Sequence, residues 1–181
     1  MAAQDTKTIV NGINIEQSFA IQNQIRDESN GDLAKPLYQA TVVWDSGYHT
    51  TTNINGDQTI NGDEPVRYGG EGMGATPQDM LLTAVGHCLT ATYIGGLSAA
   101  RINVESLRVH VSGRVNFRAA FAVEPGNPGF EDINVVVEIQ TDAPQEKVTE
   151  LLERLKHMAP IPDTIMRPVP VNIEIHQQQN R

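Results

Sequence analysis

Hydrophobic and polar positions change their spacing several times along the chain, and each change predicts a different element. Residues 13–28 repeat apolar side chains near one helical face, which predicts a short N-terminal helix that ends at the turn-forming pair Asn30–Gly31. Residues 37–60 are rich in Thr, Val, Tyr and Trp, and turn-forming residues interrupt them at 45–47 and 55–56. This second pattern predicts a β-meander.

The longest apolar stretch follows a glycine-rich loop over residues 62–75 and predicts a helix that continues to about Ala100. Thr76 is suited to cap the N-terminus of this helix, and Pro77 fits its first turn. Asp79 stands at the third helical position, where its carboxylate can complete a capping box. We therefore expect one long helix near the middle of the chain.

The distal half alternates between strand-like and helix-like patterns. Apolar residues at every second position over 107–117 and 133–139 predict two strands, joined by a turn rich in Pro and Gly. Asp142 is predicted to cap a second helix over 145–158, and residues 169–175 are predicted to form a final strand. This order of strands, long helix, strands, helix and strand predicts an α+β domain with antiparallel sheets rather than alternating βαβ units.

Length and charge restrict the class of protein. The 181 residues suit one main domain, which we place at 37–176, after an N-terminal extension over 1–36 and before a polar tail over 177–181. The net charge of −9 disfavours nucleic acid and anionic membranes as partners. The polar N-terminus lacks a secretory pattern, and glycines and a histidine interrupt the longest apolar stretch, which we interpret as too polar for a membrane span. These features predict a cytoplasmic protein.

Neither a nucleotide cofactor nor a metal ion is predicted. Residues 70–75 match the pattern G-x-G-x-x-A, but a dinucleotide site needs a buried parallel strand before the motif, and residues 63–68 are polar. The five histidines show no ligand spacing with a cysteine or a carboxylate. We expect the protein to work without a cofactor.

Cys88 is the single cysteine of the chain, which excludes an intramolecular disulfide. It shares one helical face with Ala84, Ala91 and Gly95, and such a stripe of small residues allows another backbone to approach closely. A cysteine on a small apolar face is commonly an inert core residue. A reactive thiol has to be held as the thiolate by nearby positive charge, and a cation such as Arg67 would have to come from another segment. From spacing alone, both interpretations stay open.

Several segments resemble the OsmC and organic hydroperoxide resistance superfamily. The segment A-T-P-Q-D-M-L-L-T-A-V-G-H-C-L-T over residues 75–90 is similar to the family's central helix, whose usual form is N-P-E-x-L-L-x-A-x-x-x-C. Residues 125–141 and 159–171 resemble a later strand and the Ser/Cys-Pro-Val segment with the closing strand. The resemblance covers about residues 37–176. It implies antiparallel sheets wrapped around a long central helix in an intertwined homodimer, with thiol sites at the subunit boundary.

The resemblance also implies the chemistry of the site. Better-known members reduce organic hydroperoxides with a thiolate, an arginine that stabilises it, a glutamate that orients the arginine, and a second cysteine. Cys88 takes the position of the attacking thiol and Arg67 that of the arginine. Gln78 stands in place of the glutamate, and we expect Asp79 to compensate. Ala159 stands in place of the second cysteine, so turnover would need an external thiol.

Two hypotheses follow for function. The first is a thiol-dependent peroxidase that reduces small organic hydroperoxides with an external thiol reductant and protects against oxidative stress. The alternative is a non-catalytic OsmC-like dimer that binds an apolar small molecule or senses redox state. The replacements at Gln78 and Ala159 favour the alternative, whereas the placement of Cys88 favours the first.

Overall fold

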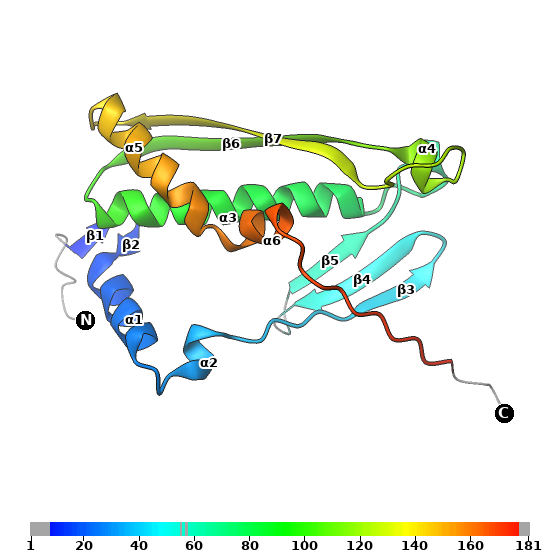
Figure 1. The fold of residues 1–181 in the computed structure, drawn as a ribbon, viewed down its shortest axis with the longest axis horizontal. Coiled ribbons are helices and arrows are strands. Elements are labelled where there is room, and N and C mark those ends of the chain that lie inside the picture. The colour runs from blue at the N-terminus through cyan, green and yellow to red at the C-terminus, as the bar shows by residue number, and fades with distance from the viewer. Residues whose placement is uncertain (1–7, 55, 57, 178–181) are drawn as a thin grey trace.

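The computed structural model describes residues 8–54, 56 and 58–177. The turn position Asn55 and the tail residues 178–181 lie outside this part of the chain. A long antiparallel hairpin of β6 (Val104–Val115) and β7 (Phe130–Thr141) extends along the central helix α3 (Pro77–Ala99), as Figure 1 shows. The predicted α+β arrangement of antiparallel sheets around one long helix is confirmed.

Helix α3 begins where the sequence predicts. Thr76 Oγ1 accepts a hydrogen bond from the backbone N–H of Asp79 at 3.1 Å, and Asp79 Oδ2 accepts one from the backbone N–H of Thr76 at 3.2 Å. This reciprocal pair is the predicted capping box. Just beyond the helix, Arg101 has a φ of 57° and turns the chain toward β6.

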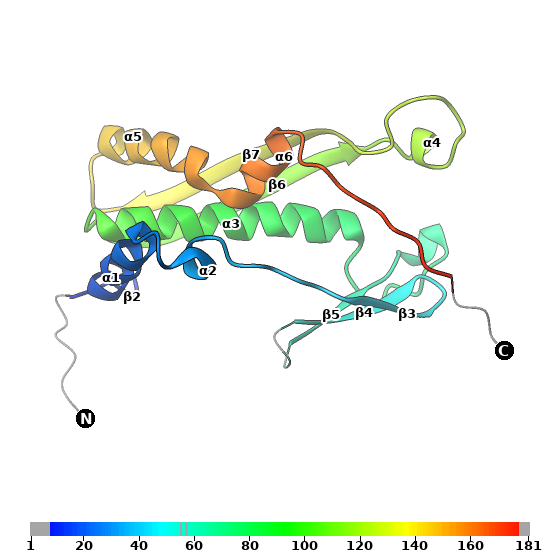
Figure 2. The same cartoon turned by 60° about the horizontal axis from the view of Figure 1, so that its bottom comes forward.

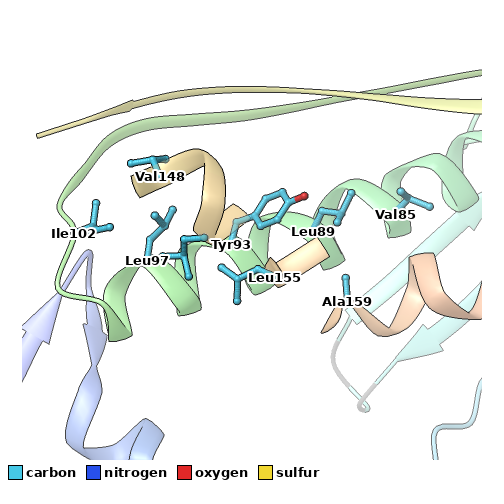
Figure 3. Close-up of a cluster of buried hydrophobic side chains, with 9 residues drawn as sticks. Val85, Leu89, Tyr93, Leu97, Ile102, Val148, Leu155 and Ala159 are labelled. Carbon is cyan, nitrogen blue, oxygen red and sulfur yellow. The ribbon is translucent and has the colours of Figure 1, made fainter. Parts of the chain in front are cut away.

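The hydrophobic core lies between α3 and the C-terminal helices. Val85, Leu89, Tyr93 and Leu97 recur every fourth residue on one face of α3 and are buried (Figure 3). They pack with residues of α5 (Gln145–Leu155), which continues into a 3-10 turn at Lys156–Met158 and then into α6 (Pro160–Met166).

The prediction that Asp142 caps the N-terminus of α5 was wrong. The N-cap residue is Pro144, and it makes no side-chain capping bond. The side chain of Asp142 instead accepts a hydrogen bond from Asn103 Nδ2 at 2.9 Å, which ties the end of β7 to the start of β6. A partner distant in sequence thus competes for the carboxylate that the local pattern assigned to the helix.

The predicted β-meander is confirmed as β3 (Val42–Ser46), β4 (His49–Ile54) and β5 (Gln58–Gly62). It lies near the N-terminal end of α3, on the side away from the hairpin, as Figure 2 shows. The glycine-rich loop that follows contains a short 3-10 helix, η2 (Val66–Tyr68).

The N-terminal extension docks on the far end of α3. After β1 (Ile9–Val10) and β2 (Ile13–Asn14), the predicted helix appears as α1 (Ile15–Arg26), and α2 (Gly31–Ala34) follows. The side-chain amide of Asn11 donates hydrogen bonds to Ser98 Oγ and to the carbonyl oxygen of Ile102, each at 2.9 Å.

Two expectations for strands were wrong. Phe117 begins a short helix, α4 (Phe117–Ala120), where we expected the end of a strand. Residues 167–177 form no strand, although apolar residues alternate through them. An extended segment needs a neighbouring strand for its N–H and C=O groups, and the described chain places none beside this one. Four of its side chains are consequently exposed: Val169, Val171, Ile173 and Ile175.

Helix α3 is long and apolar enough, by length and composition alone, to cross a membrane. The interpretation of this stretch as too polar was therefore wrong. The central helix of a folded core meets the same criterion, and α3 packs here against β6, α5 and α6.

Candidate active site

The sulfur of Cys88 lies on α3 at the point where α6 crosses it. The side chain is half-buried and borders the hydrophobic core. The backbone N–H of Ile161 donates a hydrogen bond to the Cys88 sulfur at 3.4 Å. This backbone N–H is therefore a donor directed at the sulfur.

The segment that carries this donor begins at Ala159. Ala159 is fully buried, and its carbonyl oxygen accepts the first hydrogen bond of α6, from the N–H of Asp163 at 3.1 Å. Pro160 then fits the first helical position, where a missing N–H has no cost. Ala159, which the resemblance places at the position of the family's second cysteine, therefore lies in the segment that contacts the Cys88 sulfur.

Arg67 lies in a different element from the two that meet at the Cys88 sulfur, α3 and α6. It belongs to η2, its side chain is exposed, and its guanidinium carbon lies 5.0 Å from the centre of the Tyr68 ring. Tyr68 packs edge-on against Phe117 of α4, with ring centroids 5.3 Å apart. Among the described residues, no hydrogen bond or ion pair joins Arg67 to Cys88. A single chain thus does not bring these two predicted site residues together.

Gln78 and Asp79 lie in the first turn of α3. The carboxylate of Asp79 is occupied by Thr76, from which it accepts hydrogen bonds at the backbone N–H and at the hydroxyl group, the latter at 2.7 Å. The half-buried side chain of Gln78 makes no hydrogen bond within the part of the chain that the structure describes. Neither side chain orients Arg67 in this arrangement.

A groove of about 410 Å³ separates α3 from β6 on a different face of the helix from Cys88. Asp79, Thr83 and His87 border it, so His87 faces this groove rather than the sulfur. The sequence did not predict this groove, since Val109 and Val111 of β6 form its other wall.

Asp63 organises the loop that carries Arg67, and sequence reasoning did not identify it. Its buried carboxylate accepts hydrogen bonds from the backbone N–H groups of Glu64 at 2.8 Å, Glu71 at 3.1 Å and Met73 at 3.0 Å. These bonds, that from Met73 first, hold the pKa of Asp63 below its ordinary value. The available signal was an aspartate at the start of the glycine-rich loop.

Metal-ligating side chains do not gather at the site. Across residues 8–54, 56 and 58–177, no group of three or more His, Cys, Asp or Glu side chains is arranged to hold a metal ion.

Comparisons with known proteins identify the family. The model of the OsmC-like protein family matches residues 70–174, and the chain belongs to this family. A comparison with curated proteins found no match.

Solved structures share the fold at low sequence identity. An OsmC-like protein from Mycoplasma pneumoniae is 21% identical with a TM-score of 0.63, over 73% of this chain and 89% of that chain. An organic hydroperoxide resistance protein OsmC from Legionella pneumophila is 18% identical with a TM-score of 0.52, over 72% of this chain and 91% of that chain. A putative organic hydroperoxide resistance protein from Vibrio cholerae, with captopril bound in one of its active sites, is 15% identical with a TM-score of 0.53, over 72% and 87%.

Proposed function

We propose that the protein reduces small organic hydroperoxides at Cys88, with an external thiol as reductant, and that it acts in the cytoplasm against oxidative stress. Family membership and the solved relatives described as organic hydroperoxide resistance proteins support this class of substrate. The observation that carries the proposal is the hydrogen bond from Ile161 to the Cys88 sulfur. It provides a donor for the thiolate, which is the nucleophilic form.

In the proposed reaction the Cys88 thiolate attacks the outer oxygen of the hydroperoxide. An S–O bond forms and the O–O bond breaks, so Cys88 is oxidised to a sulfenic acid while the peroxide leaves as an alcohol after taking up a proton. One external thiol then forms a mixed disulfide with Cys88 and releases water. A second external thiol restores the Cys88 thiol and leaves as the oxidised disulfide. Ala159 cannot act as an internal resolving group, which is why the reductant has to be external.

Arg67 enters this proposal from a second copy of the chain. Since one chain leaves Arg67 apart from Cys88, we propose a homodimer in which the Arg67 loop of one copy reaches the thiol of the other. Exposed apolar side chains support a second copy, among them Trp44 of β3 at 70% exposure and Val171 at 81%. The stripe that contains Cys88 is open at Gly95, where an added Cβ would meet no atom within 4 Å.

A second candidate function is a dimer that binds a small molecule or senses redox state without turnover. The capping role of Asp79 favours it, because Asp79 is then unavailable to orient Arg67. The neutral side chain of Gln78 favours it as well, since an amide attracts a guanidinium less strongly than a carboxylate does.

Trapping of the sulfenic acid tests the proposal. Anaerobically reduced protein is mixed with one equivalent of cumene hydroperoxide and then with dimedone, and the intact mass is measured. We expect one dimedone adduct at Cys88 and sustained peroxide consumption when a small dithiol is supplied. Cys88→Ser is expected to remove both. An adduct without consumption would select the redox-sensing dimer, and an unchanged mass in large peroxide excess would show that Cys88 is not a reactive thiol.

A further inference from the structure

The guanidinium group of Arg67 rests on an aromatic ring. Its central carbon lies over the ring of Tyr68, 5.0 Å from the ring centre, which is within the range of a cation–π contact. Neither Gln78 nor Asp79 bonds to Arg67, since the carboxylate of Asp79 accepts from Thr76. Among the described residues, the arginine is therefore in contact with a ring where the resemblance implies a glutamate.

The ring of Tyr68 is itself held in place by other aromatic rings. It packs edge-on against Phe117 of α4, with ring centroids 5.3 Å apart, and Phe117 packs edge-on against Phe121 at 5.9 Å. Such edge-on pairs are favourable beyond the area that they bury. The backbone N–H of Tyr68 also donates to the carbonyl oxygen of Pro65 at 2.8 Å. The ring is thus restrained both by its own turn and by the tip of the β6–β7 hairpin.

The backbone around Arg67 is restrained as well. The N–H of Gly69 donates to the carbonyl oxygen of Val66 at 3.0 Å and closes the turn that contains Arg67. Gly69 has a φ of 91°, a conformation that favours glycine. The buried carboxylate of Asp63 holds the rest of the loop through three backbone N–H groups. The remaining freedom of Arg67 lies in its side-chain torsions, and the ring of Tyr68 restricts these.

An aromatic partner leaves the arginine in a different electrostatic state from a carboxylate partner. A carboxylate commonly takes two of the guanidinium N–H donors and offsets its positive charge. The ring of Tyr68 is uncharged, and Arg67 makes no hydrogen bond within the part of the chain that the structure describes, so its five N–H donors stay free. A full positive charge with free donors suits the stabilisation of a thiolate.

We infer that Tyr68 is a positioning residue for Arg67, and that its ring face orients the guanidinium in the role that the resemblance gives to a glutamate. This inference rests on the proposed function, in which Arg67 of one copy reaches Cys88 of the other. It assigns orientation to a neutral ring and leaves the replacement at Gln78 without a penalty for the charge of the arginine.

Proton NMR of the Arg67 side chain tests the contact without any reaction. Protons over the face of an aromatic ring are shifted upfield, so we expect upfield shifts for the Arg67 side chain in the wild type. Tyr68→Phe keeps the ring and should keep these shifts, whereas Tyr68→Leu should remove them. Phe121→Leu is the matched control, because it removes a ring that does not contact Arg67, and it should leave the shifts in place.

A double-mutant cycle tests the positioning role. The quantity measured is the second-order rate constant of Cys88 oxidation by cumene hydroperoxide, followed by dimedone trapping and intact mass. Tyr68→Leu should lower it about two- to fivefold, the usual effect of one exposed cation–π contact, and Tyr68→Phe should restore it. In an Arg67→Gln background, Tyr68→Leu should have no further effect. A merely structural role of Tyr68 would slow oxidation equally in both backgrounds.

The outcomes separate this inference from the proposed function. Equal slowing in both backgrounds, Arg67 shifts that survive Tyr68→Leu, or slowing by Tyr68→Phe as large as that by Tyr68→Leu would each overturn the inference while Cys88 stays a reactive thiol. Oxidation of Arg67→Gln at the wild-type rate would overturn both the inference and the shared site. A wild type that peroxide does not oxidise would refute the proposed function instead, and the Arg67 shifts would still decide whether Tyr68 holds the guanidinium.

Discussion

The backbone N–H of Ile161 donates to the sulfur of Cys88 at 3.4 Å, across 73 residues of sequence. Helix α6 is therefore held against the middle of α3, and the buried Ala159 at its start lies near the thiol. The site combines a backbone donor to the sulfur with the absence of a second cysteine in the chain. That combination determines what oxidation of Cys88 can lead to.

Ala159→Cys should supply the missing internal thiol. With one equivalent of cumene hydroperoxide, we expect the Cys88 sulfenic acid to condense with the introduced thiol and form a disulfide, which requires the two Cα atoms to lie within about 7 Å. With excess peroxide, the wild type should proceed to sulfinic acid, whereas the variant should resist that step. Intact-mass spectrometry across the peroxide titration distinguishes these products.

Ala99→Cys is the matched control for this variant. Ala99 is exposed on the same helix, about 16 Å along its axis from Cys88, so its thiol is out of reach. We expect no intramolecular disulfide in Ala99→Cys. Sulfinic acid at Cys88 in Ala159→Cys, without a disulfide, would contradict the assignment of Ala159 to the resolving position.

Gly96 allows α5 to pack closely on α3. A Cβ at Gly96 would lie 2.6 Å from Leu155 Cδ2, whereas one at the neighbouring Gly95 would meet nothing within 4 Å. Gly96→Ala should therefore lower the free energy of unfolding by about 1–3 kcal/mol, because Leu155 has to move within the core. Gly95→Ala meets no atom of its own chain, so it should lower the free energy of unfolding less than Gly96→Ala does. Chemical denaturation at one protein concentration compares the two, and equal destabilisation would rule out this explanation.

The carboxylate of Asp63 should stabilise the Arg67 loop in a pH-dependent manner. Its folded-state pKa is lowered, so its contribution is fully present above the unfolded value of about 3.9 and is lost as the pH falls through the lower folded value. Asp63→Asn should thus be less stable than the wild type at pH 5–7, by a constant difference, and the difference should shrink below about pH 4. Unfolding measured from pH 7 to pH 3 tests this. Glu64→Gln, which removes the adjacent carboxylate and keeps that of Asp63, is the control and should keep the stability of the wild type at pH 5–7.

Local patterns predicted most elements, and long-range partners decided the rest. The capping box of Thr76 and Asp79 needs only residues three apart, so the sequence was sufficient to locate the start of α3. Asp142 carries the same kind of signal, but Asn103, distant in sequence, takes its carboxylate. The contact between Ile161 and Cys88 was not predicted, because it depends on how α6 returns to α3; the family resemblance implied only that Ala159 stands in place of the second cysteine.

The C-terminal segment shows a different limit of prediction. The alternation from Val169 to Ile175 is typical of a strand, yet the described chain provides no neighbouring strand, and Val171 and Ile173 are each 81% exposed. The pattern describes a surface that suits pairing, whereas a strand requires a partner. The contact proposed for Arg67 could not be predicted from local patterns for the same reason. The residues that Arg67 would contact belong to a second copy, and a single chain contains only one side of the proposed dimer interface.

The proposed homodimer can be tested on this segment. If a second copy covers Val171 and Ile173, the double substitution Val171→Lys and Ile173→Lys removes two buried apolar side chains, each of which contributes about 1.5–3 kcal/mol. The dissociation constant should then rise more than about a hundredfold. Asn172→Lys is the matched control, because neighbouring residues of an extended strand face opposite sides. Light scattering at micromolar concentration should find a dimer for the wild type and for Asn172→Lys, and a monomer for the double variant. Peroxide consumption should fall together with the dimer, because Cys88 then lacks Arg67 of a second copy. A wild-type monomer that still consumes peroxide would refute the shared site.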